Sequence, residues 1–442
     1  MLFDRIKLSN EDFEGAPVDT TEAIIEGDLA YADAMDIARE AMMDATAMDV
    51  AQNAVNALNA KIANEEYLLA NPEKITTETV VLAQESYRSV AAILGANVED
   101  IEGVVSHESI ENSPITALQV SHEGVKDFIV KLYESIKLLF KKIANAIKKV
   151  VVKLVVAMNG VEKAAKKLQD KLKKNNTSTP KEKNLKEKDA KVWNKYFQAI
   201  AKLSDKDNVH DAAKELLNFY TTILDSNLNN AANAIIKIGE SFEKTGEHVT
   251  DSKALNDELD SINKKISHDV IKYSWRASVL EVLDMDEDEN IIIINPVNDK
   301  VKGIIIKIEK NDDDNKKKID LKFKVGNITI KSDGITSDDV PATNPNELLT
   351  TLISAAKGLK GFSDRRIKEI DAMYKELDKL ADQKGTNVVN KFLLKQKASF
   401  GTNIRALVAG AYLDSVLGYS SATKKVLAYC RDQADMFSAN EL

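Results

Sequence analysis

Residues Gly124 to Leu154 read GVKDFIVKLYESIKLLFKKIANAIKKVVVKL. Apolar residues recur there every three or four positions, which places them on one face of an α-helix. These residues are Val125, Phe128, Ile129, Leu132, Ile136, Leu139, Phe140, Ile143, Ile147, Val150, Val151 and Leu154. Lysines occupy the opposite face. We therefore expect residues 125–174 to form one long amphipathic helix, or two helices that join near Asn159-Gly160.

Directly upstream, a four-residue motif occurs twice, as Val105-Ser106-His107-Glu108 and as Val120-Ser121-His122-Glu123. The net charge of the chain changes sign at the second copy. Residues 1–123 contain 6 Lys and Arg against 24 Asp and Glu, a net charge of −18. Residues 124–442 contain 55 and 46, a net charge of +9. The duplicated motif therefore lies at the junction between an acidic and a basic part of the chain.

The composition excludes several classes of protein. The 442 residues are 44% hydrophobic and 30% charged, as in ordinary soluble proteins. The single cysteine, Cys430, excludes an internal disulfide framework and suits a reducing compartment. The N-terminus lacks the apolar region of a secretory signal. Uncharged apolar runs stay below the roughly 18 residues of a membrane span, so we expect a soluble protein.

The acidic part predicts two helices, from Thr20 to about Lys61 and from about Thr76 to Leu94, with a turn near Asn71-Pro72. Seven alanines between Ala41 and Ala60 would let the first helix approach another helix closely. We interpret the pair as an acidic helical hairpin. Residues 95–123 are less periodic, and Gly95, Gly103 and Ser113-Pro114 interrupt them. We expect an exposed loop or weak helix there, accessible to a protease at both copies of the motif.

Beyond a Lys-rich linker at 171–191, the pattern is helical, then extended, then helical again. The expected helices are 193–203, 208–226, 227–247, 252–283, 345–358, 363–383, 386–398 and 402–435. Four strands are predicted at 290–295, 301–308, 318–325 and 327–331, with turn signals at 311–315 and at Gly326-Asn327. Trp193, Trp275, Phe197, Phe219 and Tyr220 are expected core residues. The predicted fold class is mainly α, multi-helical, with a small inserted antiparallel β-sheet at about 290–331.

Motifs for catalysis and metal binding are missing from the sequence. It has no G-x-S-x-G, G-x-x-x-x-G-K-[ST], G-x-G-x-x-G or H-E-x-x-H motif. The five histidines have neither the mutual spacing nor the neighbouring cysteines of a zinc site. Acidic clusters at 284–289 and 312–314 lack the pattern of a calcium loop and are typical of solvated turns. We therefore predict no enzyme activity, no cofactor and no metal.

The lysine face of the 125–174 helix has three interpretations: an ordinary solvated surface, a membrane-surface helix, or a surface that contacts DNA phosphates. Its residues are Lys126, Lys131, Lys137, Lys141, Lys142, Lys148 and Lys149. Lysines without base-reading residues predict salt-sensitive binding to DNA without sequence specificity. We favour DNA over a membrane, because the acidic part would neutralise a basic surface until it is removed.

The order of acidic segment, Ser-His-Glu motif and basic helix resembles the internal head, or prohead-core, proteins of giant tailed phages. In those proteins a prohead protease removes an acidic helical propeptide, and it cuts after a small residue, any residue and Glu. The resemblance implies cleavage after Glu108, after Glu123 or after both. The residues of the two sites would be Ser106, His107, Glu108 and Ser109, and Ser121, His122, Glu123 and Gly124.

This resemblance implies a non-enzymatic protein of the virion head interior, made in the host cytoplasm. Its partners would be the prohead protease, capsid or core proteins, and packaged DNA. The corresponding division is a propeptide (1–123), a basic helical region and linker (124–190), a helical domain (191–284), the sheet (285–340) and a C-terminal helical region (341–442). One alternative is an unprocessed cytoplasmic scaffold whose basic helix binds a partner or a membrane surface. Another is an enzyme with a site built from acids in 270–340.

Overall fold

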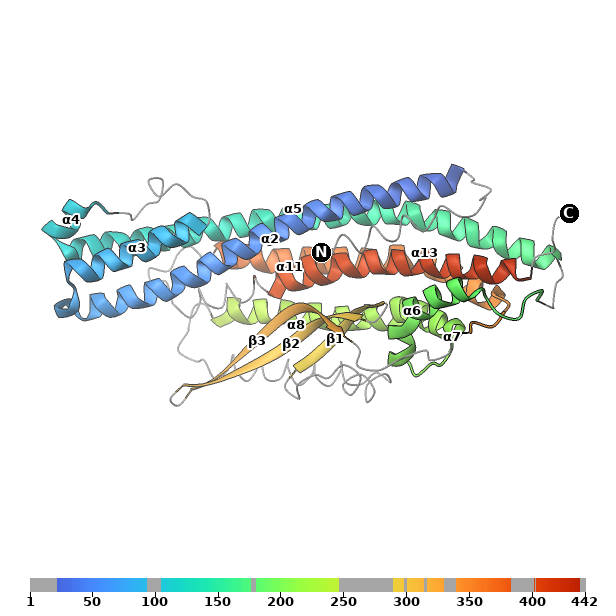
Figure 1. Cartoon of the computed structure of the whole chain (residues 1–442). Coiled ribbons are helices and arrows are strands. Elements are labelled where there is room, and N and C mark those ends of the chain that lie inside the picture. The colour runs from blue at the N-terminus through green and yellow to red at the C-terminus, as the bar shows by residue number, and fades with distance from the viewer. Residues whose placement is uncertain are drawn as a thin grey trace.

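Long helices lie side by side along one axis of the computed structural model, and a small sheet covers one flank of them (Figure 1). The structure describes residues 22–93, 105–175, 180–245, 289–297, 300–313, 316–329, 339–382, 401 and 403–437. The predicted fold class, mainly α with a small antiparallel sheet, is confirmed. Two of the expected helices, 252–283 and 386–398, lie outside the described residues, as does Trp275.

Helix α5 is the central element and extends from Pro114 to Asn175 without a break. Its predicted apolar face is buried, and Val125, Ile136, Ile147 and Leu154 have no exposed surface. Asn159 and Gly160 lie inside the helix, so the prediction of one long helix is the correct one of the two. Because this face would otherwise meet water along the whole length of α5, other helices must cover it.

Helix α2 (Glu22–Ala70) runs antiparallel to α5 and covers it on one side (Figure 1). Its buried stripe consists mainly of alanines, at positions 30, 34, 38, 41, 45, 51 and 54, with Met48 in the stripe between positions 45 and 51. Small side chains let the two helix backbones approach closely. At Gly27 a Cβ atom would lie 3.3 Å from the carbonyl oxygen of Ala157. The acidic segment therefore supplies an outer layer of the helical core.

The predicted turn at Asn71-Pro72 is confirmed by the short helix η1 (Pro72–Lys74), after which α3 (Thr77–Ile93) turns back. However, α3 covers only one end of α2, and the main partner of α2 is α5. The two acidic helices therefore do not form a separate hairpin. The hydrophobic effect explains this arrangement, since the long apolar face of α5 offers more area than the 17 residues of α3.

Two long helices pack on the other side of α5: α11 (Asn346–Asp382) and α13 (Leu413–Asp435). A third, α8 (Leu224–Thr245), packs against α11. Two helices had been predicted at 345–358 and 363–383, but α11 continues through Gly358 and Gly361. Gly358 serves close packing rather than a break, because a Cβ there would come within 2.9 Å of the Tyr419 hydroxyl oxygen. That hydroxyl donates a hydrogen bond to the carbonyl of Ala355 (2.8 Å).

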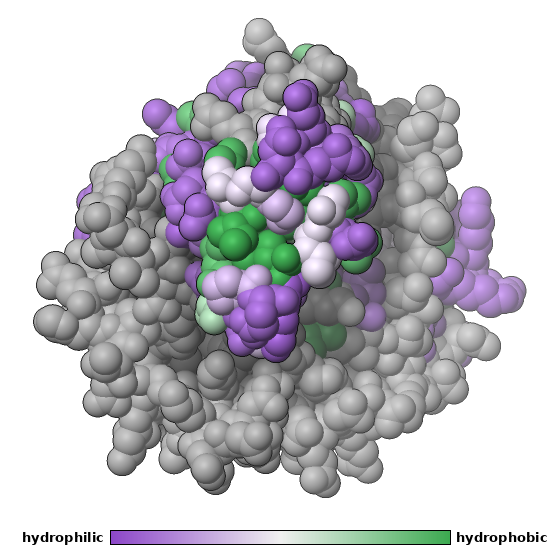
Figure 2. Space-filling view, turned by 90° about the vertical axis from the view of Figure 1, so that its left-hand side faces the viewer, coloured by the Kyte–Doolittle hydropathy of each residue, from purple (hydrophilic) through white to green (hydrophobic). Residues whose placement is uncertain are grey.

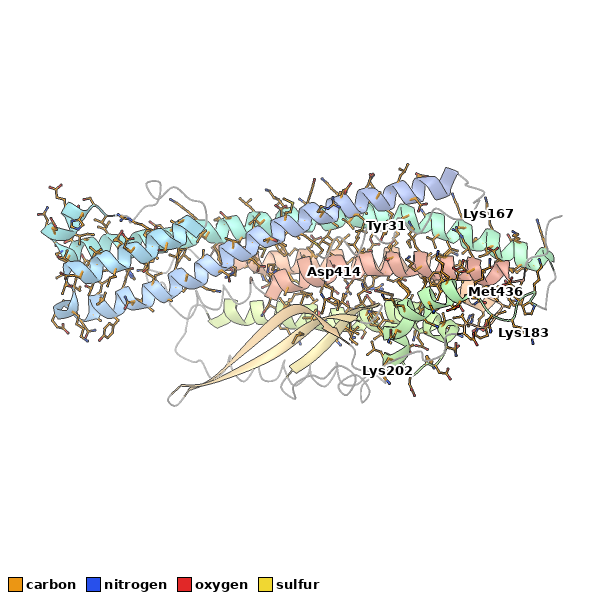
Figure 3. All side chains as sticks on the ribbon, viewed as in Figure 1. Tyr31, Lys167, Lys183, Lys202, Asp414 and Met436 are labelled. Atoms are coloured by element: carbon orange, nitrogen blue, oxygen red, sulfur yellow. The ribbon has the colours of Figure 1, made fainter. Side chains whose placement is uncertain are left out.

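Shorter helices complete this side: α6 (Glu187–Leu203), α7 (Val209–Asn218) and two π-helical segments, η3 (Phe219–Ile223) and η4 (Ala406–Tyr412). The predicted Lys-rich linker is shorter than expected, because α5 extends to Asn175. Residues 180–186 are tied to the C-terminal part: the Lys181 amide donates to the Met436 carbonyl, and the Ala342 amide donates to the Lys183 carbonyl (2.9 and 2.8 Å). Figure 3 labels Lys183 and Met436 at this end of the molecule.

The sheet has three antiparallel strands in the order β1 (Glu289–Val297), β2 (Lys300–Asp313) and β3 (Lys316–Thr329). The predicted fourth strand is wrong, because Gly326-Asn327 is not a turn. Gly326 continues β3 and pairs with Gly303 of β2. Polar contacts attach the sheet to the helices. Lys302 forms an ion pair with Asp414 of α13 (labelled in Figure 3), and Tyr220 of η3 donates a hydrogen bond to Asn295 (2.8 Å).

An aromatic cluster joins α6 to α13, as expected for Trp193 and Phe197. Both rings pack against Tyr429. The Trp193 indole N–H donates a hydrogen bond to the carboxylate of Asp432 (2.7 Å). Burial raises the pKa of Asp432 to about 6, although this hydrogen bond opposes the shift. The two groups therefore form a pair that titrates in a measurable range.

We expect the fluorescence of Trp193 to change with a midpoint near pH 6, because protonation of Asp432 alters the acceptor of its indole N–H. The folded protein binds this proton more tightly than the unfolded chain. The contribution of Asp432 to the free energy of unfolding therefore falls as pH rises from 3.8 through about 6. The transition should be missing in Asp432→Asn. A transition that persists in this variant would have to be assigned to another group, such as one near Trp275.

In the described part of the chain, every helix falls short of the length of apolar sequence that crosses a membrane.

Candidate processing site

The first copy of the motif lies at the end of the molecule that carries α3 and the short helix α4 (His107–Asn112) (Figure 1). Ser106 has an extended backbone (φ −68°, ψ 151°) and caps α4: its hydroxyl accepts a hydrogen bond from the Ser109 amide. Ser106, His107, Glu108 and Ser109 are all exposed. One residue of α4, Ile110, is buried. This copy is therefore accessible and only lightly held.

Two further contacts involve the first Ser-His-Glu copy and the residue before it. The Val105 amide donates to the side-chain oxygen of Gln84 in α3 (3.3 Å), and His107 lies 3.2 Å from the carboxylate of Glu111, one helical turn away. Figure 2 looks onto this end, where apolar side chains gather in the middle of a hydrophilic border. Ile115 and Val120, at the beginning of α5, are 44% and 50% exposed. This end of the molecule thus places the extended Ser106 and the short helix α4 close to exposed apolar groups.

The second copy is in a different environment, and the expectation of an exposed loop is wrong for it. Residues 120–123 lie inside α5, where Ser121 and His122 are 0% and 6% exposed. The Ser121 hydroxyl donates a hydrogen bond to Glu65 Oε1 of α2 (3.1 Å), and His122 Nδ1 lies 3.3 Å from Oε2 of the same carboxylate. Only Glu123 of the three motif residues remains exposed.

Glu65 is the centre of a buried polar cluster that joins α2, α3 and α5. Its carboxylate has no exposed surface and lies 3.4 Å from the ammonium group of Lys61. Lys61 also donates to the carbonyl of Ala83 (2.6 Å) and lies 4.5 Å from the centre of the Tyr87 ring. Burial lowers the pKa of Lys61 to about 8, although Glu65 opposes the shift. Such a cluster is stable only while all its partners stay in place.

The predicted lysine face is partly used inside the molecule. Lys137 and Lys148 form ion pairs with Asp378 and Asp371 of α11, the second at 2.8 Å. Lys126 lies 3.3 Å from Glu123, and Lys131 is exposed. Lys141, Lys142 and Lys149 are exposed. The predicted DNA-contacting set is therefore divided between structural lysines and lysines that face solvent.

Acids of α2 pair with cations of the basic part. Asp33 contacts Lys153 of α5 (2.7 Å), Asp28 contacts Lys424 of α13 (2.6 Å), and Asp49 contacts Arg405. Lys424 also lies 4.4 Å from the centre of the Tyr31 ring. These contacts follow the line along which α2 covers the rest of the protein. The acidic layer therefore neutralises specific cations of residues 124–442 in addition to lowering the net charge.

Comparison with known proteins identifies the family. The family model of phiKZ-like phage internal head proteins matches residues 21–436. The chain belongs to this family. Neither the curated proteins nor the solved structures contain a significant match. The resemblance seen in the sequence is therefore confirmed, and the internal head protein is a component of the phage head interior.

The difference between the two motif copies of this internal head protein is partly encoded in the sequence. Leu118, Ser121, His122 and Val125 follow the three-and-four spacing of the buried face of α5. Extending that periodicity upstream from Val125 would have placed Ser121 and His122 on the buried face. No pattern in the sequence indicated that Glu65 is their partner, because Glu65 lies 56 residues before Ser121.

A second fully buried charge lies elsewhere in this internal head protein. Arg366 of α11 has no exposed side-chain surface, and its Nη2 contacts Asp225 (3.1 Å), Glu369 (2.9 Å) and Asn229. Its guanidinium lies 5.3 Å from the centres of two rings, Phe362 and Tyr412. We interpret this enclosed cluster as structural. Among the described residues, His, Cys, Asp and Glu side chains nowhere gather in a group of three suited to a metal ion.

Proposed function

We propose that this internal head protein is a structural component of the phage head that is processed after Glu108, in the first Ser-His-Glu copy. A protease binds its substrate as an extended segment, so it needs a region that opens at low cost. The main observation that supports this proposal is that Ser106 is extended and exposed at the beginning of a six-residue helix. The protease would be the prohead protease, which acts while the protein is inside the prohead.

Cleavage after Glu108 would break the chain between the leader, which is residues 1–108, and residues 109–442. The leader contains 6 Lys and Arg and 22 Asp and Glu, a net charge of −16, and the rest has a net charge of +7. Departure of the leader would also free Lys153, Lys424 and Arg405 from their acidic partners. The product is attracted to DNA phosphates, whereas the precursor is repelled by them. The proposed role is therefore non-specific contact with packaged DNA.

A second possibility is an internal head protein that remains uncut and acts as a scaffold. The packing of α2 favours it, because the acidic segment forms a layer of the core along α5. In that case the acidic surface would face other head proteins, and contact with DNA would be weak. The mass of the protein in mature particles distinguishes the two possibilities.

The intact mass of the protein from purified virions should correspond to a chain that begins at Ser109, or at Gly124 where the leader has departed and the bond after Glu123 has also been cut. The same measurement on particles that lack an active prohead protease should give the full chain from Met1, and this serves as the control. A full-length chain in mature virions would contradict the processing proposal and support the uncut scaffold.

Lysines of α5 that face solvent should carry the DNA contact. We expect Lys141→Gln, Lys142→Gln and Lys149→Gln together to weaken DNA binding by the processed protein. The dependence of log K on log salt should also become less steep by about 2.7, since each phosphate contact contributes about −0.9 to the slope. The matched control, Lys183→Gln, Lys186→Gln and Lys188→Gln, removes the same charge from exposed positions outside α5. Equal effects of the two triple variants would contradict a binding surface on α5.

A further inference from the structure

We infer that the leader conceals the second Ser-His-Glu copy, so that cleavage after Glu123 requires prior cleavage after Glu108 and departure of α2. This inference rests on the processing proposed above and assigns an order to the two sites. The two copies share their three motif residues but differ in local structure. That difference decides which bond a protease can reach first.

Opening the first copy disturbs little of the structure. Ser106 is already extended, and α4 is six residues long with Ile110 as its buried residue. A single short helix has little cooperative stability of its own. Local unfolding of residues 106–112 would therefore be populated far more often than unfolding of the core.

Opening the second copy disturbs the core. Residues 120–124 lie inside the 62-residue helix α5, flanked by Leu118 and Val125, neither of which has exposed surface. An extended conformation at this point would break helical hydrogen bonds on both sides of Glu123. It would also withdraw two apolar side chains and two polar side chains from buried positions.

Glu65, a residue of the leader, holds the second copy in place. Its carboxylate accepts the Ser121 hydroxyl and faces His122, and all three side chains are buried. Pulling the motif out would leave a buried carboxylate with Lys61 as its remaining partner, which is costly. When α2 leaves, the same serine and histidine lose their partner and the first turns of α5 lose their cover. The concealed copy then becomes a free helix end.

The test is a time course of full-length protein with purified prohead protease, in which the N-termini of the products are measured by intact mass. It is run at a denaturant concentration that dissociates the leader once it is cut but leaves the uncut chain folded. Glu108→Gln should lower the rate at which the Gly124 product forms at least tenfold. Glu123→Gln should leave the formation of the Ser109 product unchanged. A Gly124 product formed from Glu108→Gln at the wild-type rate would overturn the inferred order.

A second pair of variants tests the role of Glu65 directly. In the Glu108→Gln background, Glu65→Ala should restore cleavage after Glu123, whereas Glu66→Ala, at the adjacent and partly exposed position, should not. Glu65→Gln, which keeps the size of the side chain, should restore it partly and guards against misfolding of the alanine variant. If neither Glu65 variant restores cleavage while both melt cooperatively, Glu65 does not hold the site closed.

A general Glu-specific endopeptidase separates failure of this inference from failure of the proposed function. On the full chain it should cut after Glu108 before it cuts after Glu123, because that order depends on accessibility alone. If it does so but the prohead protease cuts neither bond, the concealment holds and the processing proposal is wrong. If it cuts after Glu123 first, the concealment is wrong whatever the prohead protease does.

Discussion

After a single cut behind Glu108, the two pieces of the internal head protein should remain bound to each other. The leader contains α2, whose larger buried side chains include Met48, Val55, Leu58, Ile62 and Leu68. At about 1.5–3 kcal/mol for each buried side chain, these five contribute about 8–15 kcal/mol before the entropy of association is subtracted. The alanine stripe and the ion pairs of Asp28 and Asp33 add to this. Cleavage alone would therefore not remove the leader.

Size-exclusion chromatography and native mass spectrometry of the cut protein measure this directly, and the two pieces should elute together at moderate salt. Leu58→Asp, which places a charge at a position with no exposed surface, should release the leader after the cut. Ala57→Asp, on the exposed side of the same helix, is the matched control and should leave the complex intact. Immediate separation of the wild-type pieces would show that α2 contributes less binding energy than its burial indicates.

Replacement of Arg366 by alanine should lower the free energy of unfolding by about 3–5 kcal/mol, the usual effect of removing one partner of a buried ion pair. The variant leaves the carboxylates of Asp225 and Glu369 close together without the guanidinium between them. Burial already raises the pKa of Glu369, and the charge of Arg366 opposes that rise. In the variant the pKa should rise further, so the loss of stability should shrink as the pH is lowered and Glu369 becomes protonated.

Arg365→Ala is the matched control, because Arg365 contacts the same carboxylate of Asp225 (2.9 Å) but is 47% exposed. An exposed ion pair contributes about 0–1 kcal/mol, so this variant should melt close to the wild type. Thermal and urea denaturation at two pH values measure both variants. If Arg366→Ala loses no more stability than Arg365→Ala, the buried cluster does not anchor α11 to α8.

Because α2 packs on α5, removal of the leader would change the structure of the protein as well as its charge. The net charge of the chain can reverse only when the leader departs, and departure uncovers the apolar face of α5 that α2 had buried. The proposed processing would therefore be tied to a rearrangement of the core. The first motif copy is accessible in the precursor. The second is buried beneath the leader and would become accessible only after the leader departs.

Periodicity predicted the helices well where it was strong. The amphipathic pattern of 125–174 predicted α5, and the alanine spacing predicted a helix that approaches another helix closely. The turn at Asn71-Pro72 could be predicted because the effect of proline on a helix depends only on neighbouring residues. Glycine misled in two places. Gly326-Asn327 was predicted to be a turn and a helix was predicted to end at 358, whereas Gly326 pairs within the sheet and Gly358 allows close packing against Tyr419.

By itself, the sequence of this protein determined the mainly helical class, the long amphipathic helix, the acidic and basic parts and the two copies of Ser-His-Glu. These are local or compositional properties, and neighbouring residues encode them. Only the tertiary structure decided that α2 covers α5 and that Glu65 holds Ser121 and His122, while Ser106 remains exposed. The reason is that burial depends on which distant helix supplies the covering surface, and a motif of three residues carries no information about that partner.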